Sequence, residues 1–350
     1  MKNRQYVIYA AVIVILAALV YLQFRTWKNF DWATFLSQTG HVNKLRVLFG
    51  VAWIYLAYVM RAIRWNIFLR PVRRASAVRL MTPTIVGFTG LALLGRAGEM
   101  IRPYLIARKE NLSFSSQLAV WAVERVFDMA AFGLLLVSAI AVAPTTRALL
   151  RFYRIGDIGT IAVGVIAVAF GVFMIWKGDH VIISVTGSLS PSVSALGRRA
   201  ALLIREFRSG LNAIRDLWSL LYAIVVSVSM WIMIALAYRE VLQSYGQGPV
   251  DLPILQVPLL MLSSMLGSLV ALPGVGGGTQ LATIFTLRKV FSAPQELAAS
   301  CGILLWLVTF ASVIPAGLIL AHRERLSLRK LSAESEQAED VAASENISGP

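Results

Sequence analysis

The chain has 350 residues, of which 57% are hydrophobic and only 15% are charged, and its mean hydropathy is +0.70. A soluble domain carries about 45–50% apolar and about 25% charged residues, so this composition excludes a water-soluble globular protein and indicates a membrane protein. The net charge of +15 would suggest a nucleic-acid partner in a soluble protein. Here the basic residues lie in short loops between apolar blocks, where such residues set topology and meet lipid headgroups. We therefore expect no nucleic-acid partner.

Several apolar blocks are long enough to cross a bilayer, which takes about 20 residues per helix. They are Tyr6–Leu22, Leu45–Met60, Ser116–Ala143, Ile158–Trp176, Leu217–Tyr238 and Ala298–Ala321. The first follows a charged start, as in a signal peptide, but no small-residue cleavage site follows it, so we interpret it as an uncleaved helix. Within the loop Lys177–Asp216, the segment Ala195–Ile214 is either an amphipathic interfacial helix or a solvated linker helix.

Two further apolar blocks are interrupted. One is Leu80–Gly95, broken by a proline and two glycines, and the other is Leu252–Leu272, followed by the turn PGVGGG. After each comes a stretch too short to span a membrane, Glu99–Arg108 or Thr279–Val290, then a basic pair and a long apolar helix. This shared order predicts an internal repeat with two re-entrant hairpins, because paired broken helices in corresponding positions mark the binding sites of many transporters.

Positive charge predicts the orientation of the chain. Four segments are rich in Lys and Arg: the N-terminus, the segment after the second long block, the loop Lys177–Asp216 and the C-terminus. The second of these begins with Arg61 and Arg64. Their charge places all four in the cytoplasm. This arrangement fits six spans and two hairpins that enter from opposite sides, so that the two halves are inverted repeats. Some basic residues remain in the proposed outer loops: Arg25, Lys28, Lys44, Arg46, Arg147, Arg151 and Arg154.

The predicted fold is therefore an all-α polytopic transmembrane helical bundle with two re-entrant hairpins arranged as inverted repeats. We expect it in the cell inner membrane, with both termini in the cytoplasm. The transmembrane domain covers residues 1–321. Residues 322–350 form a basic and then acidic cytoplasmic tail, which we expect to be disordered because it is rich in Ala, Ser and Glu.

The third long block contains charged residues. Ionisable groups inside a membrane segment are costly and are functional candidates by default. Glu124 and Asp128 share a helix face at i,i+4, and Arg125 reaches Asp128 at i,i+3. Asp128 lies on the order of 15 Å into a helix that starts near Leu118, close to the middle of a bilayer. These residues either pin helices together as a self-neutralising cluster or form the polar floor of a substrate cavity.

The first hairpin tip has the sequence GRAGEMIRP, which brings Arg96, Glu99 and Arg102 to the tip or mouth. Buried charges need partners. We expect Glu99 to pair with Arg125, and the tip arginines to pair with the two carboxylates of the third long block. An anionic headgroup is a further candidate, because arginine offers a bidentate fork to phosphate. The alternative is a set of interfacial charges that snorkel to the membrane surface.

The second hairpin tip has the sequence LPGVGGGTQLA. Exposed backbone N–H groups at the start of a short helix can hold an anion, but glycines also permit irregular backbone at membrane depth, and the sequence does not decide between these roles. Thr279 and Gln280 add neutral hydrogen-bonding groups. The candidate substrate-binding residues of the two tips and the third long block are Arg96, Glu99, Arg102, Glu124, Arg125, Asp128, Gly276, Gly277, Gly278, Thr279 and Gln280.

No zinc-protease, Walker or nucleophile motif and no paired metal-ligand pattern occurs in the sequence. The single cysteine, Cys301, lies in an apolar block. We therefore expect no catalytic residues, no metal, no cofactor and no enzymatic activity.

Three segments, G-R-A-G-E…R-P, E-R-V-x-D and P-G-x-G-G-G, resemble the transmembrane region of lysylphosphatidylglycerol synthases, a group also called flippase-like or uncharacterised protein family 0104. The resemblance covers roughly Leu45–Ala321 and implies lipid translocation, because in the fused synthases this region is assigned to flipping aminoacylated phosphatidylglycerol. The chain departs from the group in having only a short tail in place of a soluble aminoacyl-transferase domain. It also has Thr279-Gln280 where the family often has an acidic residue. Both departures argue against an aminoacylated lipid as substrate.

Our leading hypothesis is a flippase-like protein that translocates or binds a phospholipid or lipid-linked substrate, with the headgroup between the hairpins and the acyl chains in lipid. The alternative is a non-transporting accessory or scaffold protein, whose partner would be a membrane glycosyl- or aminoacyl-transferase. A third hypothesis is an integral membrane transferase that uses Glu124 or Asp128 as a base, although no donor-binding motif is visible.

Overall fold

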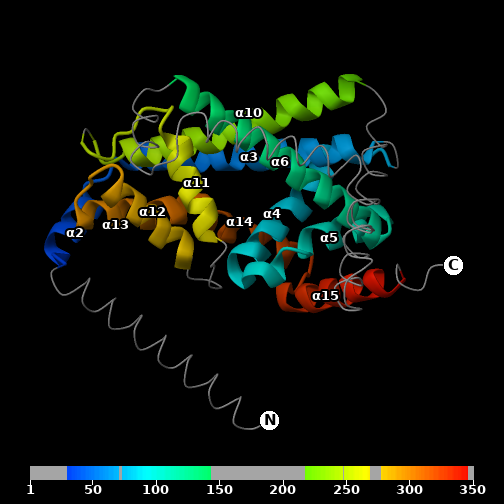
Figure 1. The fold of residues 1–350 in the computed structure, drawn as a ribbon. Coiled ribbons are helices and arrows are strands. Elements are labelled where there is room, and N and C mark those ends of the chain that lie inside the picture. Colours follow the sequence, from blue (N-terminus) through cyan, green and yellow to red (C-terminus); the bar gives the residue numbers. More distant parts are fainter. Residues whose placement is uncertain (1–29, 71–72, 143–216, 247, 269–276, 346–350) are drawn as a thin grey trace, which may run out of the picture.

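The computed structural model describes residues 30–70, 73–142, 217–246, 248–268 and 277–345, and within these ranges it is built of helices without strands (Figure 1). The predicted blocks Tyr6–Leu22 and Ile158–Trp176 and the segment Ala195–Ile214 lie outside the described residues. The all-α prediction is confirmed for the part of the chain that is described.

Long helices occupy the predicted apolar blocks that fall within the described residues. Among the described residues, four helices are long and apolar enough to cross a membrane. They are α3 (Lys44–Leu69), α4 (Ala77–Leu94), α10 (Leu217–Gln243, with the candidate span Trp218–Gln243) and the helical run Gln295–Arg323. Helix α6 (Phe114–Val142) has 29 residues, about 44 Å at 1.5 Å per residue, and carries the charged residues of the third long block. Helix α4 differs from the prediction of an interrupted block, because it continues through its internal Pro83.

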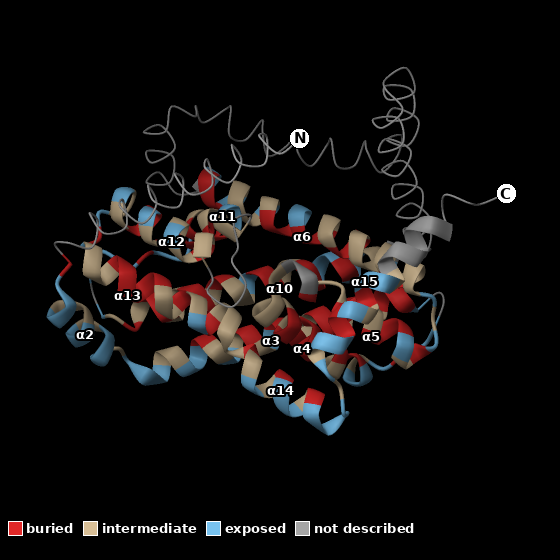
Figure 2. Cartoon of the chain, turned by 90° about the horizontal axis from the view of Figure 1, so that it is seen from below, coloured by how far each residue is buried: buried red, intermediate tan, exposed pale blue. Residues whose placement is uncertain are grey.

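The remaining elements are short. They are α2 (Trp32–Gly40), the 3₁₀ turn η1 (Gly95–Gly98), α5 (Ile101–Glu110), α11 (Val257–Ser268), α12 (Gly277–Lys289), α13 (Gln295–Trp306), the π-helical turn η2 (Leu307–Ala311), α14 (Val313–Arg323) and α15 (Leu328–Glu345). Three of them, α13, η2 and α14, follow one another to make up the run Gln295–Arg323. Figure 2 shows buried residues concentrated on α4, α5 and α13, whereas α2 has none.

Two helix pairs pack back on themselves at glycines. Helix α4 ends at Gly95, whose φ of 63° suits glycine, and α5 returns along it. A Cβ at Gly87 of α4 would overlap the Cβ of Arg102 on α5. Helix α12 packs against α11 in the same manner, since a Cβ at Gly267 would overlap the backbone carbonyl of Gly278. Closely packed helix pairs therefore occur at both interrupted blocks within the described residues.

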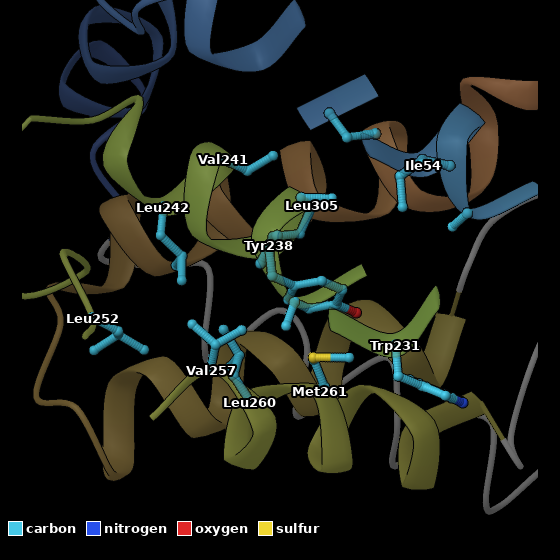
Figure 3. Packing of buried hydrophobic residues seen from close by; sticks show 14 of the residues in the cluster. Ile54, Trp231, Tyr238, Val241, Leu242, Leu252, Val257, Leu260, Met261 and Leu305 are labelled. Atoms are coloured by element: carbon cyan, nitrogen blue, oxygen red, sulfur yellow. The ribbon is translucent and has the colours of Figure 1, made fainter. Parts of the chain in front are cut away.

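The main hydrophobic core lies where α10 packs against α3, α11 and α13. Tyr238 of α10 sits between Met261 of α11 and Leu305 of α13, and all three are at most 6% exposed (Figure 3). Helices α3 and α10 run side by side (Figure 1). This packing fixes α3, which supplies two arginines to the site described below.

The C-terminal segment forms a helix in place of the expected disordered tail. Helix α15 packs on α5, where the Tyr104 hydroxyl donates to Glu334 Oε2 at 3.0 Å. Leu331 is 2% exposed and joins a small cluster with Ile101 and Leu105. The physical reason is that Ala and Glu are strong helix formers, and that Leu331 and the buried Ser335 share one helix face at i,i+4.

Candidate functional site

Four arginines and two carboxylates from three helices meet inside the protein. Helix α3 supplies two arginines one turn apart, the first turn of α5 supplies one, and α6 supplies both carboxylates and the fourth arginine. We call this group the arginine–carboxylate cluster, and its members are Arg61, Arg64, Arg102, Glu124, Arg125 and Asp128.

Glu124 is the centre of the cluster and is fully buried. Its Oε1 lies 2.7 Å from Arg64 Nη2, and its Oε2 lies 2.8 Å from Arg102 Nη1. The other two arginines are more distant, with Arg61 Nη1 at 3.7 Å and Arg125 Nη2 at 3.8 Å. One carboxylate therefore ties α3, α5 and α6 together.

Asp128 binds the same arginines one turn further along α6. Its Oδ1 lies 2.7 Å from Arg64 Nη1, and its Oδ2 lies 3.3 Å from Arg61 Nη1 and 3.6 Å from Arg125 Nη2. Arg64 thus bridges both carboxylates, and its Nη1 also donates to Ser227 Oγ of α10 at 3.0 Å. Arg64 is completely buried, so its position is set by these partners.

Aromatic rings cover the guanidinium groups where carboxylates do not. The Arg102 guanidinium carbon lies 4.2 Å from the centre of the Trp65 ring and 5.4 Å from that of Phe88. Arg61 lies 4.9 Å from the Phe88 centre. A cation over a ring face within about 6 Å is attracted to it, more strongly where water is excluded. The rings let positive charge remain buried without a matching anion.

The cluster carries more positive than negative charge. Four guanidinium groups face two carboxylates, which leaves two positive charges in excess. Buried arginine Nε atoms of Arg64, Arg102 and Arg125 also have no hydrogen-bond partner among the described residues. Within the same residues, no group of three His, Cys, Asp or Glu side chains is placed to hold a metal ion. An excess of buried donors and positive charge favours an anion as the ligand.

A small cleft opens beside the cluster, between α4 and α6. Its volume is about 20 Å³, enough for one or two water molecules. Arg125 lies at the cleft with its guanidinium carbon 5.7 Å from the Trp121 ring centre and its side chain 40% exposed. The residues that line the cleft are Gly87, Phe88, Leu91, Glu99, Arg102, Trp121 and Arg125. The cleft gives the cluster an opening toward the outside of the protein.

The structure brings together most of the charged residues proposed from the sequence. Arg102 pairs with Glu124 as expected for a tip arginine. The expected ion pair between Glu99 and Arg125 is wrong, because Arg125 pairs with the two carboxylates of its own helix. Glu99 is half-buried and lines the cleft. The side chain of Arg96 lies outside what the structure describes.

The residues of the second hairpin tip do not join the cluster within the described ranges. Gly277, Gly278, Thr279 and Gln280 begin α12, which lies on the other side of the molecule from α5 (Figure 1). Near them, Thr283 donates to the Thr279 carbonyl at 2.8 Å and shares a 2.6 Å hydrogen bond with Ser264 of α11. These polar groups join α12 to α11. Gly276 lies outside the described residues.

Sequence reasoning missed two members of the cluster, Arg61 and Arg64. The prediction counted them as cytoplasmic topology signals, but α3 continues to Leu69 and buries both. The signal was present: the segment RAIRWNIFL keeps apolar residues between its arginines, and two arginines at i,i+3 complement two carboxylates at i,i+4.

The fold and the cluster define a helical membrane protein with a buried, positively charged polar centre. A family model for the lysylphosphatidylglycerol synthase TM region matches residues 7–317, so the chain belongs to this family, as the resemblance predicted. The chain is also similar to a UPF0104 membrane protein of Methanothermobacter thermautotrophicus, with 23% identity over 303 residues that cover 81% of this chain and 87% of that protein. No solved structure matches the chain.

Proposed function

We propose that this protein binds an anionic lipid headgroup at the arginine–carboxylate cluster and moves it across the membrane as a flippase-like protein. The observation that carries the proposal is the excess of two positive charges in the arginine–carboxylate cluster, which lies beside a cleft. Membership of a family named for lysylphosphatidylglycerol synthase supports a lipid-related role. The acyl chains would stay in the lipid while the headgroup enters between α4 and α6.

Arg102 and Arg125 are the residues that we expect to hold the headgroup. Both line the cleft, and both have a buried Nε without a hydrogen-bond partner among the described residues. A guanidinium group binds a phosphate through two parallel N–H donors. Because Arg102 is fixed by Glu124, it provides a rigid half of the site.

Arg125 is the member best placed to move. Its distances to Glu124 and Asp128, 3.8 and 3.6 Å, exceed those that Arg64 makes to the same carboxylates, and it is the most exposed arginine of the cluster. The cleft is too small for a phosphate group as it stands, so we expect Arg125 to swing from the carboxylates to the arriving headgroup. The exchange leaves the contacts of Arg64 in place.

The arrangement of the chain in the bilayer is part of the same proposal. Both helical hairpins end in a basic pair, Arg108-Lys109 in α5 and Arg288-Lys289 in α12, and a long helix follows each. These matched orders support inverted repeats with re-entrant hairpins in the cell inner membrane and both termini in the cytoplasm. Cysteine accessibility beside Gly98 and Gly277 tests this: labelling of the two positions from opposite sides supports the arrangement, and labelling from one side overturns it.

Transbilayer movement of fluorescent phosphatidylglycerol and phosphatidic acid in reconstituted vesicles tests the function. We expect the wild-type protein to accelerate movement and Arg125→Gln to slow it at least about tenfold, which corresponds to the loss of about one charge-assisted hydrogen bond. Arg46→Gln is the matched control, because Arg46 lies on α3 but pairs with Glu240 at the other end of the helix. Absence of any protein-dependent movement across a panel of anionic and lipid-linked substrates would overturn the flippase proposal and favour the accessory role.

A further inference from the structure

The cleft contains an acidic residue beside its arginines, and this residue constrains the headgroup. Glu99 lines the cleft together with Arg102 and Arg125. No hydrogen bond or ion pair joins it to another described side chain, and its neighbour Gly98 packs against the backbone of Gly90, which fixes the turn that carries it. A carboxylate in an anion site repels the ligand unless the ligand brings a proton donor to it.

From this geometry we infer that the headgroup is a phosphate monoester, that is, the terminal phosphate of a lipid. Its P–OH group donates to Glu99, and its remaining oxygens accept hydrogen bonds from Arg102 and Arg125. The inference rests on the proposed function, because it names the headgroup that the same site takes. No covalent step is involved.

The charge and the proton of a phosphate monoester together match the site. A phosphate monoester has a second pKa near 6, so its singly protonated form carries one negative charge and one transferable proton. That charge and the charge of Glu99 together neutralise the two excess positive charges of the arginine–carboxylate cluster. The shared proton lies between the carboxylate and the phosphate, where two bare anions would repel each other.

Other headgroups fit less well, a phosphodiester because it lacks the proton and the others because of their charge. A phosphodiester has no P–OH group and therefore places an unprotonated anion beside Glu99. A zwitterionic diester with an ammonium group leaves one positive charge of the cluster unmatched. A headgroup with a cationic aminoacyl group leaves two unmatched, since its net charge is positive. Phosphatidylglycerol is the closest competitor, because its glycerol hydroxyls are alternative donors to Glu99.

The inference is tested by measuring which lipid the protein retains in nanodiscs. The nanodiscs consist of phosphatidylcholine with equal amounts of phosphatidic acid and phosphatidylglycerol. Mass spectrometry of the bound lipid should show a preference for phosphatidic acid of at least about tenfold, since like-charge juxtaposition costs several kcal/mol. Glu99→Gln should bring the ratio close to one by improving phosphatidylglycerol binding, whereas Glu99→Asp should keep the preference. Glu240→Gln, on the distant Arg46 pair, is the control and should keep the wild-type ratio.

Each other result has a distinct meaning. Equal retention of both lipids by the wild type, with both lost in Arg125→Gln, overturns the monoester inference and leaves the proposed function standing. Retention of neither lipid above phosphatidylcholine overturns the proposed function itself. Displacement of phosphatidic acid by soluble glycerol phosphate at a similar concentration supports the monoester chemistry but overturns the lipid as its source. A wild-type ratio in Glu99→Gln overturns the role given to Glu99.

Discussion

Replacement of Glu124 by Gln removes the carboxylate on which the arginine–carboxylate cluster is centred. The change keeps the size of the side chain, but Arg64 and Arg102 lose their contacts at 2.7 and 2.8 Å, and the excess positive charge of the cluster rises from two to three. Breaking a buried ion pair by removing one partner costs about 3–5 kcal/mol. At roughly 2 °C per kcal/mol for a large chain, we expect Glu124→Gln to lower the Tm by roughly 6–10 °C.

The lone cysteine provides the assay. Cys301 is fully buried in α13, so a thiol-reactive fluorophore labels it only as the helices separate on heating. Glu240→Gln is the matched control, since Glu240 and Arg46 are 21% and 40% exposed, and a pair of this kind contributes at most about 1 kcal/mol. Equal melting curves for Glu124→Gln and Glu240→Gln would refute the reasoning that the buried charges hold α3, α5 and α6 together.

Two further predictions concern local structure. Gly87→Ala should destabilise the α4–α5 pair by about 1–3 kcal/mol, because the added Cβ would overlap Arg102. Gly40→Ala is the control and should leave the Tm unchanged, because a Cβ at Gly40 meets no atom. Equal Tm values for the two variants would show that α4 and α5 separate freely. The hydrogen bonds from Thr34 lower the pKa of the Asp31 carboxyl below its usual 3.8, so its capping of α2 is present above that pH and is lost as the pH falls through the lowered value. Hydrogen exchange of the α2 amides should therefore be faster in Asp31→Ala than in the wild type at neutral pH. In strong acid the two proteins should exchange at the same rate. Equal rates at neutral pH would show that Asp31 does not cap α2.

The long apolar helices were predictable because a bilayer imposes one rule on them. A long apolar run must close its backbone hydrogen bonds within a helix, so Leu217–Tyr238 was recognisable as α10 to within a few residues. Gly87 stood out as an interruption of its apolar block, and the structure shows that it lies within α4 and allows the close approach of α5.

The composition of the site was only partly predictable. The carboxylates Glu124 and Asp128 stood out because they interrupt an apolar run. Arg61 and Arg64 did not, because they follow the run and arginine-rich segments at helix ends usually mark the cytoplasmic side. Their burial depends on tertiary contacts with α6 that no local pattern contains. Helix α15 had a local signal in its Ala and Glu content, but its contacts with α5, such as the hydrogen bond from Tyr104, are tertiary.

The lipid that co-purifies with the protein from its membrane shows whether the arginine–carboxylate cluster binds an anionic headgroup. We expect the wild-type protein and Arg46→Gln to retain an anionic lipid enriched above its share in the membrane. Arg125→Gln should lose this enrichment while its melting curve stays close to that of the wild type. Bound lipid that matches the bulk membrane in all three proteins would show that the excess positive charge of the cluster does not bind an anionic headgroup.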